Sequence, residues 1–134
     1  MKVLFYGLFM DEDLLIAKGL VPSSSQKAWV NNFVLKIGER ASLVKEPGAR
    51  SFGVVMTLKQ TQVTELYDEK SVKAYQPEKL IVEYEDGTRE EVTCYNLPAN
   101  LIRGTNRIYA QQLLKLTTRL GFPDDFLAHV RSFV

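Results

Sequence analysis

The chain opens with an apolar run that stops at a glycine and gives way to an acidic, leucine-containing segment. Residues 3–6 are β-branched and aromatic without polar alternation, which predicts a buried strand. Gly7 ends this strand, and Asp11 is suited to be the N-cap of a short helix that stops at Gly19. The first twenty residues therefore predict a strand, a turn and a helix in that order.

The next hundred residues alternate between strand-like runs and turn signals. Residues 27–38 have strand composition, interrupted at Asn31 and Asn32, which indicates either a bulge in one long strand or a turn between two short ones. Pro47 and Gly48 lie between two further apolar runs, a pattern typical of a turn. We therefore expect a hairpin with its turn at Pro47 and Gly48.

A short helix and a second hairpin are expected after that. Residues 61–69 place apolar side chains on one face at helical spacing, which predicts a helix that ends near Glu69. Asp86 and Gly87 separate two apolar-rich segments and form the strongest hairpin signal in the chain. Pro77 cannot donate a ladder hydrogen bond, so it should lie at a strand's beginning or at a sheet edge.

The C-terminal third has a helical pattern. Thr105 can cap a helix whose leucines recur at helical intervals until Gly121, and a second short helix follows Pro123. Asn106 and its neighbours precede the long helix, where capping is their expected role. No repeat, linker or low-complexity segment divides the chain, so residues 1–134 are expected to form a single α+β domain.

Charge and cysteine content limit the classes of function. The chain has 17 basic and 16 acidic residues in 134, a formal charge of +1, which gives no electrostatic case for a nucleic-acid or membrane partner. The single cysteine, Cys94, allows no intramolecular disulfide and no zinc cluster. With no signal-peptide pattern and no apolar run of about 20 residues, we expect a cytoplasmic protein.

The usual catalytic side chains are scarce. His129 is the only histidine, and its place on an amphipathic C-terminal segment favours a structural role over catalysis. Cys94 fits a strand pattern and is expected to be packed. Gly7 lacks the following glycines that phosphate loops and dinucleotide-binding loops require. What remains is a glycine turn after the first strand and a carboxylate, Glu69, at the end of a helix.

These two features are chemically complementary if the fold brings them together. Backbone N–H groups after a glycine turn can hold an anion, and a carboxylate can move a proton. Arg40 and Arg50 could also bind a carboxylate through a bidentate fork, although exposed arginines are common.

Four segments, in order along the chain, resemble the gamma-glutamylcyclotransferase-like superfamily over essentially residues 1–120. The segments are FYGLFM, GERASLVKEPGARSFGVVMTL, LYDEKSVKAYQPEKLIV and EDGTREEVTCYNL. The resemblance implies a mixed α+β fold with a strongly curved or barrel-like sheet and short helices.

Enzymes of this family cleave gamma-glutamyl amides by internal acyl transfer, and the resemblance implies the same acyltransferase chemistry here. The α-amine of the substrate attacks, and 5-oxoproline and a free amine are released. A protein nucleophile, a metal and a cofactor are then unnecessary. The implied partner is a small gamma-glutamyl substrate, bound by a monomer or a homodimer.

The resemblance also implies roles for particular residues. Glu69 would act as general base and later as general acid. Backbone groups after the first strand would bind the α-carboxylate or the carbonyl oxygen, and two tyrosines would shape the pocket, one of them donating a hydrogen bond. The implied substrate-binding residues are Tyr6, Gly7, Leu8, Phe9 and Tyr75.

The sequence departs from the family pattern in two places. Leu8 stands where the family usually has a Ser or Thr, so only backbone donors are expected there. Counting back from Val72 aligns the family's catalytic glutamate with Lys70, whereas Glu69 lies one position earlier and Asp68 two. The second hypothesis is therefore an inactive relative that binds a small anion or amino acid. A third is an interaction domain that uses an apolar face of the C-terminal helices and has no pocket.

Overall fold

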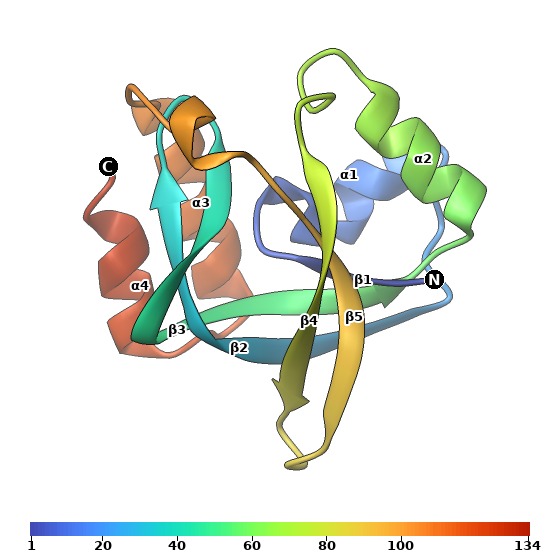
Figure 1. Cartoon of the computed structure of the whole chain (residues 1–134), viewed down its shortest axis with the longest axis horizontal. Helices are drawn as coiled ribbons and strands as arrows, with labels where there is room; N and C mark the ends of the chain where they lie inside the picture. Colours follow the sequence, from blue (N-terminus) through green and yellow to red (C-terminus); the bar gives the residue numbers. More distant parts are fainter.

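A computed structural model describes residues 1–134, and its five strands form a closed barrel in the order β1-β3-β2-β4-β5. The strands are β1 (Lys2–Phe5), β2 (Ser24–Ile37), β3 (Ala41–Thr57), β4 (Gln76–Tyr84) and β5 (Arg89–Asn96). The α-helices are α1 (Glu12–Ala17), α2 (Gln60–Asp68), α3 (Arg107–Arg119) and α4 (Asp124–Arg131). Two 3-10 turns, η1 (Leu8–Met10) and η2 (Ala99–Leu101), complete the chain. The mixed, barrel-like α+β fold expected from the resemblance is confirmed (Figure 1).

Strand β1 closes the barrel. It pairs antiparallel with β3 and parallel with β5, where Val3 faces Thr93 and Leu4 faces Cys94. Because β1 is paired on both sides and its last three residues are buried, it reads as an uninterrupted apolar run. Strand β1 therefore lies between β3 and β5 and completes the closed sheet.

The expected hairpin turn at Pro47 and Gly48 is wrong. Strand β3 runs continuously through both residues, and the turn that joins β2 to β3 lies at residues 38–40. The register shifts between Asn31 and Phe33, where Asn32 has φ 65° and its Oδ1 accepts the Gly48 N–H at 3.0 Å. Pro47 and Gly48 therefore belong to an irregularity between two long paired strands and not to a hairpin turn. Of the two alternatives for Asn31 and Asn32, the bulge in one long strand is the correct one.

Most other local expectations are confirmed. Asp11 caps α1 by accepting the Asp13 N–H, and helix α2 ends just before Glu69. The β4–β5 hairpin turns at Gly87, which has φ 85°, and Pro77 is the second residue of β4.

The sequence offered two capping residues for α3, Thr105 and Asn106. Asn106 is the cap, because its Oδ1 accepts the Tyr109 N–H. The expected cap at Thr105 is wrong by one residue.

Helices α3 and α4 pack beside each other next to the long β2–β3 hairpin (Figure 1). The Phe52 ring of β3 lies 5.9 Å from the ring of Phe122 and 5.3 Å from that of Phe126. The apolar faces of α3 and α4 are therefore used for internal packing. No helix combines the length and the apolar character that crossing a membrane requires.

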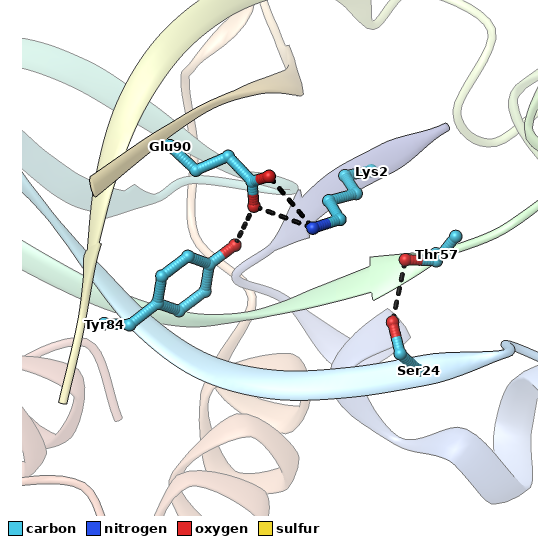
Figure 2. A network of polar contacts seen from close by, with 5 residues as sticks. All are labelled: Lys2, Ser24, Thr57, Tyr84 and Glu90. Atoms are coloured by element: carbon cyan, nitrogen blue, oxygen red, sulfur yellow. Dashed lines mark hydrogen bonds and ion pairs between the residues drawn. The ribbon is translucent and has the colours of Figure 1, made fainter. Parts of the chain in front are cut away.

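Polar contacts join the strands near the barrel closure (Figure 2). The Lys2 ammonium of β1 lies 2.9 Å from a carboxylate oxygen of Glu90 in β5, and the Tyr84 hydroxyl donates to the other oxygen of Glu90 at 2.6 Å. The Tyr84 hydroxyl lowers the pKa of Glu90, and Lys2 lowers it further. A separate contact joins the hydroxyls of Ser24 and Thr57 at 2.7 Å.

Candidate functional site

A cavity of about 340 Å³ opens at the end of β1, lined by 17 residues of which ten are hydrophobic. It lies between the β1–α1 segment, the β2–β3 turn, the α2–β4 segment and the start of α3. This volume is in the range of small-molecule sites. All six residues singled out in the sequence line it: Tyr6, Gly7, Leu8, Phe9, Glu69 and Tyr75.

The Gly7 turn presents backbone N–H groups. The 3-10 turn that follows is closed by bonds from Met10 N–H to the Gly7 carbonyl and from Asp11 N–H to the Leu8 carbonyl, both 3.0 Å. As at the start of any helical turn, the first N–H groups have no partner within the turn itself. Gly7 has φ −107°, which any residue adopts, so backbone conformation does not require glycine here.

Close approach of Tyr109 is the reason for glycine at position 7. A Cβ on Gly7 would collide with the Tyr109 hydroxyl, which comes from the first turns of α3. Burial, and to a lesser degree Tyr75, raises the pKa of the Tyr109 phenol, while the Leu8 N–H acts in the opposite direction. The backbone at Gly7 and Leu8 is therefore in close contact with a protonated phenol.

Aromatic rings form one wall of the site. Tyr67 stacks on Tyr95 with ring centroids 4.0 Å apart, and it contacts Phe9 edge to face at 5.9 Å. The Tyr6 hydroxyl donates to the Tyr95 carbonyl at 2.7 Å, and burial raises the pKa of both Tyr6 and Tyr67. This wall is rigid, because each ring is held by another ring or by a hydrogen bond.

Tyr75 also lines the cavity, with its ring centroid 6.1 Å from that of Tyr67. Its hydroxyl donates to the Ala41 carbonyl at 2.5 Å, and burial raises its pKa to about 12, although the nearby Arg40 guanidinium acts in the opposite direction. A phenol has a single O–H proton, so in this state Tyr75 offers a ligand its ring and an acceptor oxygen.

Glu69 is the carboxylate of this cavity. It lies just after α2, at the cavity rim, and 43% of its side chain is exposed. Its two oxygens accept from the Lys18 ammonium at 2.9 and 3.0 Å. The neighbouring alternatives lie elsewhere: Asp68 is exposed and pairs with Lys73 at 3.8 Å, and Lys70 does not line the cavity.

Sequence reasoning missed several polar residues that line the cavity, namely Lys18, Glu39, Ser71 and Tyr109. Lys18 directly follows α1 and Tyr109 belongs to α3, and neither carries a local motif that would mark it. Asn106 caps α3 as expected and also lines the cavity. His129 and Cys94 lie away from it, His129 with Nε2 2.6 Å from the Leu35 carbonyl and Cys94 buried as a free thiol. No group of three or more His, Cys, Asp or Glu side chains is arranged to hold a metal.

Comparisons of sequence find no match among protein-family models or curated proteins. Solved structures do match. A gamma-glutamyl cyclotransferase structure aligns with a TM-score of 0.78 at 15% identity, covering 100% of this chain and 88% of that one. A human protein described as uncharacterized aligns with a TM-score of 0.74 at 16% identity, covering 99% and 87%.

A third structure is a yeast gamma-glutamyl cyclotransferase specific to glutathione, with a TM-score of 0.60 at 13% identity, covering 99% of this chain and 96% of that one. At these identities the likeness concerns the fold. The chain has the gamma-glutamylcyclotransferase-like fold, as its sequence segments suggested.

Proposed function

We propose that the protein is a gamma-glutamylcyclotransferase-type enzyme that releases 5-oxoproline from a small gamma-glutamyl amide or peptide. The observation that carries the proposal is the convergence of Glu69 and the Gly7 turn on one cavity, although they lie far apart in the sequence. The fold is that of solved gamma-glutamyl cyclotransferases, which supports the reaction class but does not by itself assign a substrate.

The reaction requires little covalent chemistry from the protein. The substrate's α-nitrogen bonds to its γ-carbonyl carbon, and the bond from that carbon to the leaving nitrogen breaks. Overall the α-nitrogen loses two protons and the leaving nitrogen gains two, so the products are 5-oxoproline and a protonated amine. Holding the chain folded for this five-membered ring closure can contribute about 7 kcal/mol or more.

Glu69 is the residue we assign to proton transfer. Its carboxylate is at the cavity rim and already binds a cation, the Lys18 ammonium. A substrate ammonium would replace Lys18 there, give a proton to Glu69 and become the nucleophile, and Glu69 would return this proton to the leaving nitrogen. The second proton would pass from the attacking nitrogen to the leaving nitrogen by the same route after the new bond has formed.

Donors at the Gly7 turn are assigned to the oxygen atoms of the substrate. The N–H groups of Gly7, Leu8 and Phe9 would bind the developing oxyanion or the α-carboxylate. The Tyr109 hydroxyl lies against Gly7, so it adds an O–H at a place where Leu8 supplies no side-chain donor. Tyr6 and Tyr75 shape the walls.

One observation favours the second hypothesis, a module that binds an amino acid or small anion without turnover. The Lys18–Glu69 pair presents one cation and one anion side by side, which complements the carboxylate and ammonium of any α-amino acid. The third hypothesis, an interaction domain without a pocket, is contradicted by the cavity and by the internal packing of α3 and α4.

The setting of the proposed enzyme follows from the same features. We expect a cytoplasmic protein, because its one cysteine is a buried free thiol and such thiols are typical of reducing compartments. We also expect a single domain that is a monomer or a homodimer. Size-exclusion chromatography with light scattering would measure the oligomeric state.

The test is production of 5-oxoproline from a panel of gamma-glutamyl dipeptides and gamma-glutamyl amines, quantified by mass spectrometry. We expect product with the wild type and a loss of at least about 100-fold in Glu69→Gln, the contribution typical of a general base. Glu65→Gln is the matched control, because Glu65 is an exposed carboxylate of α2 outside the cavity. Saturable binding without product would support the binding module instead, and equal losses in both variants would remove Glu69 from the chemistry.

A further inference from the structure

We propose that Arg40 is a carboxylate-binding residue of the cavity, holding a carboxylate group of the ligand with its guanidinium. The proposal deepens the proposed function and rests on it for the identity of the ligand. It concerns a part of the site, the β2–β3 turn, that is separate from Glu69 and the Gly7 turn.

The charges in the cavity are unevenly matched. Four charged side chains line it, and two of them, Lys18 and Glu69, pair with each other. Glu39 leans over Gly104, with its Cγ 3.0 Å and its Oε1 3.2 Å from the position that a Cβ on Gly104 would occupy. Arg40 forms no ion pair, since no carboxylate lies within 4.0 Å of it. It is therefore a half-buried cation without an acidic partner.

Most donors of Arg40 are unused. Its Nη1 donates to the Ser71 carbonyl over 3.4 Å, at the long end for a hydrogen bond, and its Cζ lies 6.0 Å from the centre of the Tyr75 ring. A guanidinium has five N–H donors in a planar fork, which matches a carboxylate in a bidentate manner. The Tyr75 ring holds the guanidinium beside the cavity through a cation–π contact, and the remaining donors are available to a ligand.

The turn that carries Arg40 is held in place. The Gly38 N–H donates to the Arg40 carbonyl at 3.0 Å, and the Glu39 N–H donates to the Arg103 carbonyl at 2.8 Å. The Asn106 side-chain amide donates to the Glu39 carbonyl at 3.1 Å. A Cβ on Gly38 would come within 2.5 Å of the Arg103 carbonyl oxygen, so the two backbones are in direct contact. The guanidinium thus starts from a fixed base, which lowers the entropy lost on binding.

A gamma-glutamyl amino acid offers two carboxylates, the α-carboxylate of the glutamyl unit and that of the leaving amino acid. Either has the chemistry that Arg40 recognises. Three ligands separate them: γ-glutamyl-alanine, its analogue with the alanine carboxylate replaced by a carboxamide, and its analogue with the glutamyl α-carboxylate replaced by a carboxamide. Each analogue removes one negative charge and little volume.

The variants are Arg40→Met, Arg40→Lys and the control Arg50→Met. Arg50 is matched because its guanidinium also lies over an aromatic ring, with Cζ 5.5 Å from the Trp29 centroid, but it is on β3 and outside the cavity. Where the wild type forms 5-oxoproline, the readout is KM and kcat/KM. Where it does not, the ligand persists and calorimetry gives Kd. Circular dichroism confirms that each variant is folded.

We expect Arg40→Met to weaken γ-glutamyl-alanine about 10-fold or more, as loss of a charged hydrogen-bonded partner does, while Arg50→Met has no effect. Arg40→Lys should fall between, because it keeps the charge and loses the fork. Arg40→Met should leave the affinity for one of the two carboxamide analogues unchanged. That analogue lacks the carboxylate that Arg40 binds, so it identifies which carboxylate this is. Equal effects of Arg40→Met on all three ligands, or none beyond Arg50→Met, would overturn the proposal.

Failure of this proposal and failure of the proposed function give different results. Turnover of γ-glutamyl-alanine that is indifferent to Arg40 keeps the enzyme and removes the carboxylate site. Arg40-dependent binding without turnover keeps the carboxylate site and removes the enzyme. Neither binding nor turnover of any of the three ligands by the wild type would remove both.

Discussion

The contact between Gly7 and Tyr109 can be tested by adding one methyl group. In Gly7→Ala the backbone needs no change, since φ is −107°, but the new Cβ meets the Tyr109 hydroxyl and lies 3.8 Å from the Tyr109 Cζ. Either the α3 helix or the ring must move. Tyr109→Phe removes the oxygen that the methyl group meets and leaves the ring in place.

The expected magnitudes follow from overpacking. Gly7→Ala should lower the free energy of unfolding by about 1–3 kcal/mol, which for a chain of this size corresponds to roughly 4 °C in Tm per kcal/mol. Tyr109→Phe alone should cost about 1 kcal/mol, because the Leu8 N–H faces its hydroxyl. In the double variant the methyl group occupies the vacated space, so the total loss should be at least about 1 kcal/mol smaller than the sum of the single losses.

The assay is urea unfolding followed by the fluorescence of Trp29, the only tryptophan. Gly87→Ala serves as the control. Its cost comes from φ 85°, nothing lies within 4 Å of its Cβ, and it should therefore add to Tyr109→Phe without coupling. If Gly7→Ala and Tyr109→Phe are equally additive, the close approach of the hydroxyl is not what requires glycine at position 7, and the reasoning is refuted.

Two further outcomes concern ion pairs. Lys18→Met should lower the KM for gamma-glutamyl substrates about two- to fivefold, because the Lys18 ammonium no longer competes with the substrate for Glu69. The magnitude follows from the strength of partly exposed ion pairs, which stabilise by up to about 1 kcal/mol. A raised KM in the same kinetic assay would mean that Lys18 itself holds the substrate. Glu90→Gln should cost about 0.5–1 kcal/mol at pH 7 by urea unfolding. The pKa of Glu90 is lower in the folded state than in the unfolded state, where it is about 4.3. The stabilisation by Glu90 is therefore present above the unfolded-state pKa and is lost as the pH falls through the folded-state pKa. A stability difference between wild type and Glu90→Gln that persists at low pH would contradict this prediction.

Elements with strong local signals were predictable. The strand, turn and helix at the N-terminus depend on an apolar run, Gly7 and the Asp11 cap, all within one short segment. The β4–β5 hairpin depends on Asp86 and Gly87, whose conformational preferences favour a turn between any two strands. In each case the residues that decide the structure are neighbours in the chain.

The Pro47 and Gly48 segment was not predictable in this way. The same two residue types favour a turn and a bulge, and the choice depends on what lies across the ladder. Here Asn32 on β2 accepts the Gly48 N–H, and β2 and β3 remain paired on both sides of the irregularity. This matters for the site, because β2 and β3 are joined by a turn at residues 38–40 and this turn places Arg40 at the cavity.

The sequence by itself determined most of the strands and helices, although it divided β3 into two strands at Pro47 and Gly48. Its resemblance to a known family pointed to Glu69 and the Gly7 turn. The tertiary structure alone decided how the charges and hydroxyls of the cavity are matched. Lys18 pairs with Glu69, Tyr109 covers Gly7, and Arg40 is left without an acidic partner. These relations depend on distances of a few ångströms between segments that only barrel closure brings together, and the spacing of residues along a chain does not encode them.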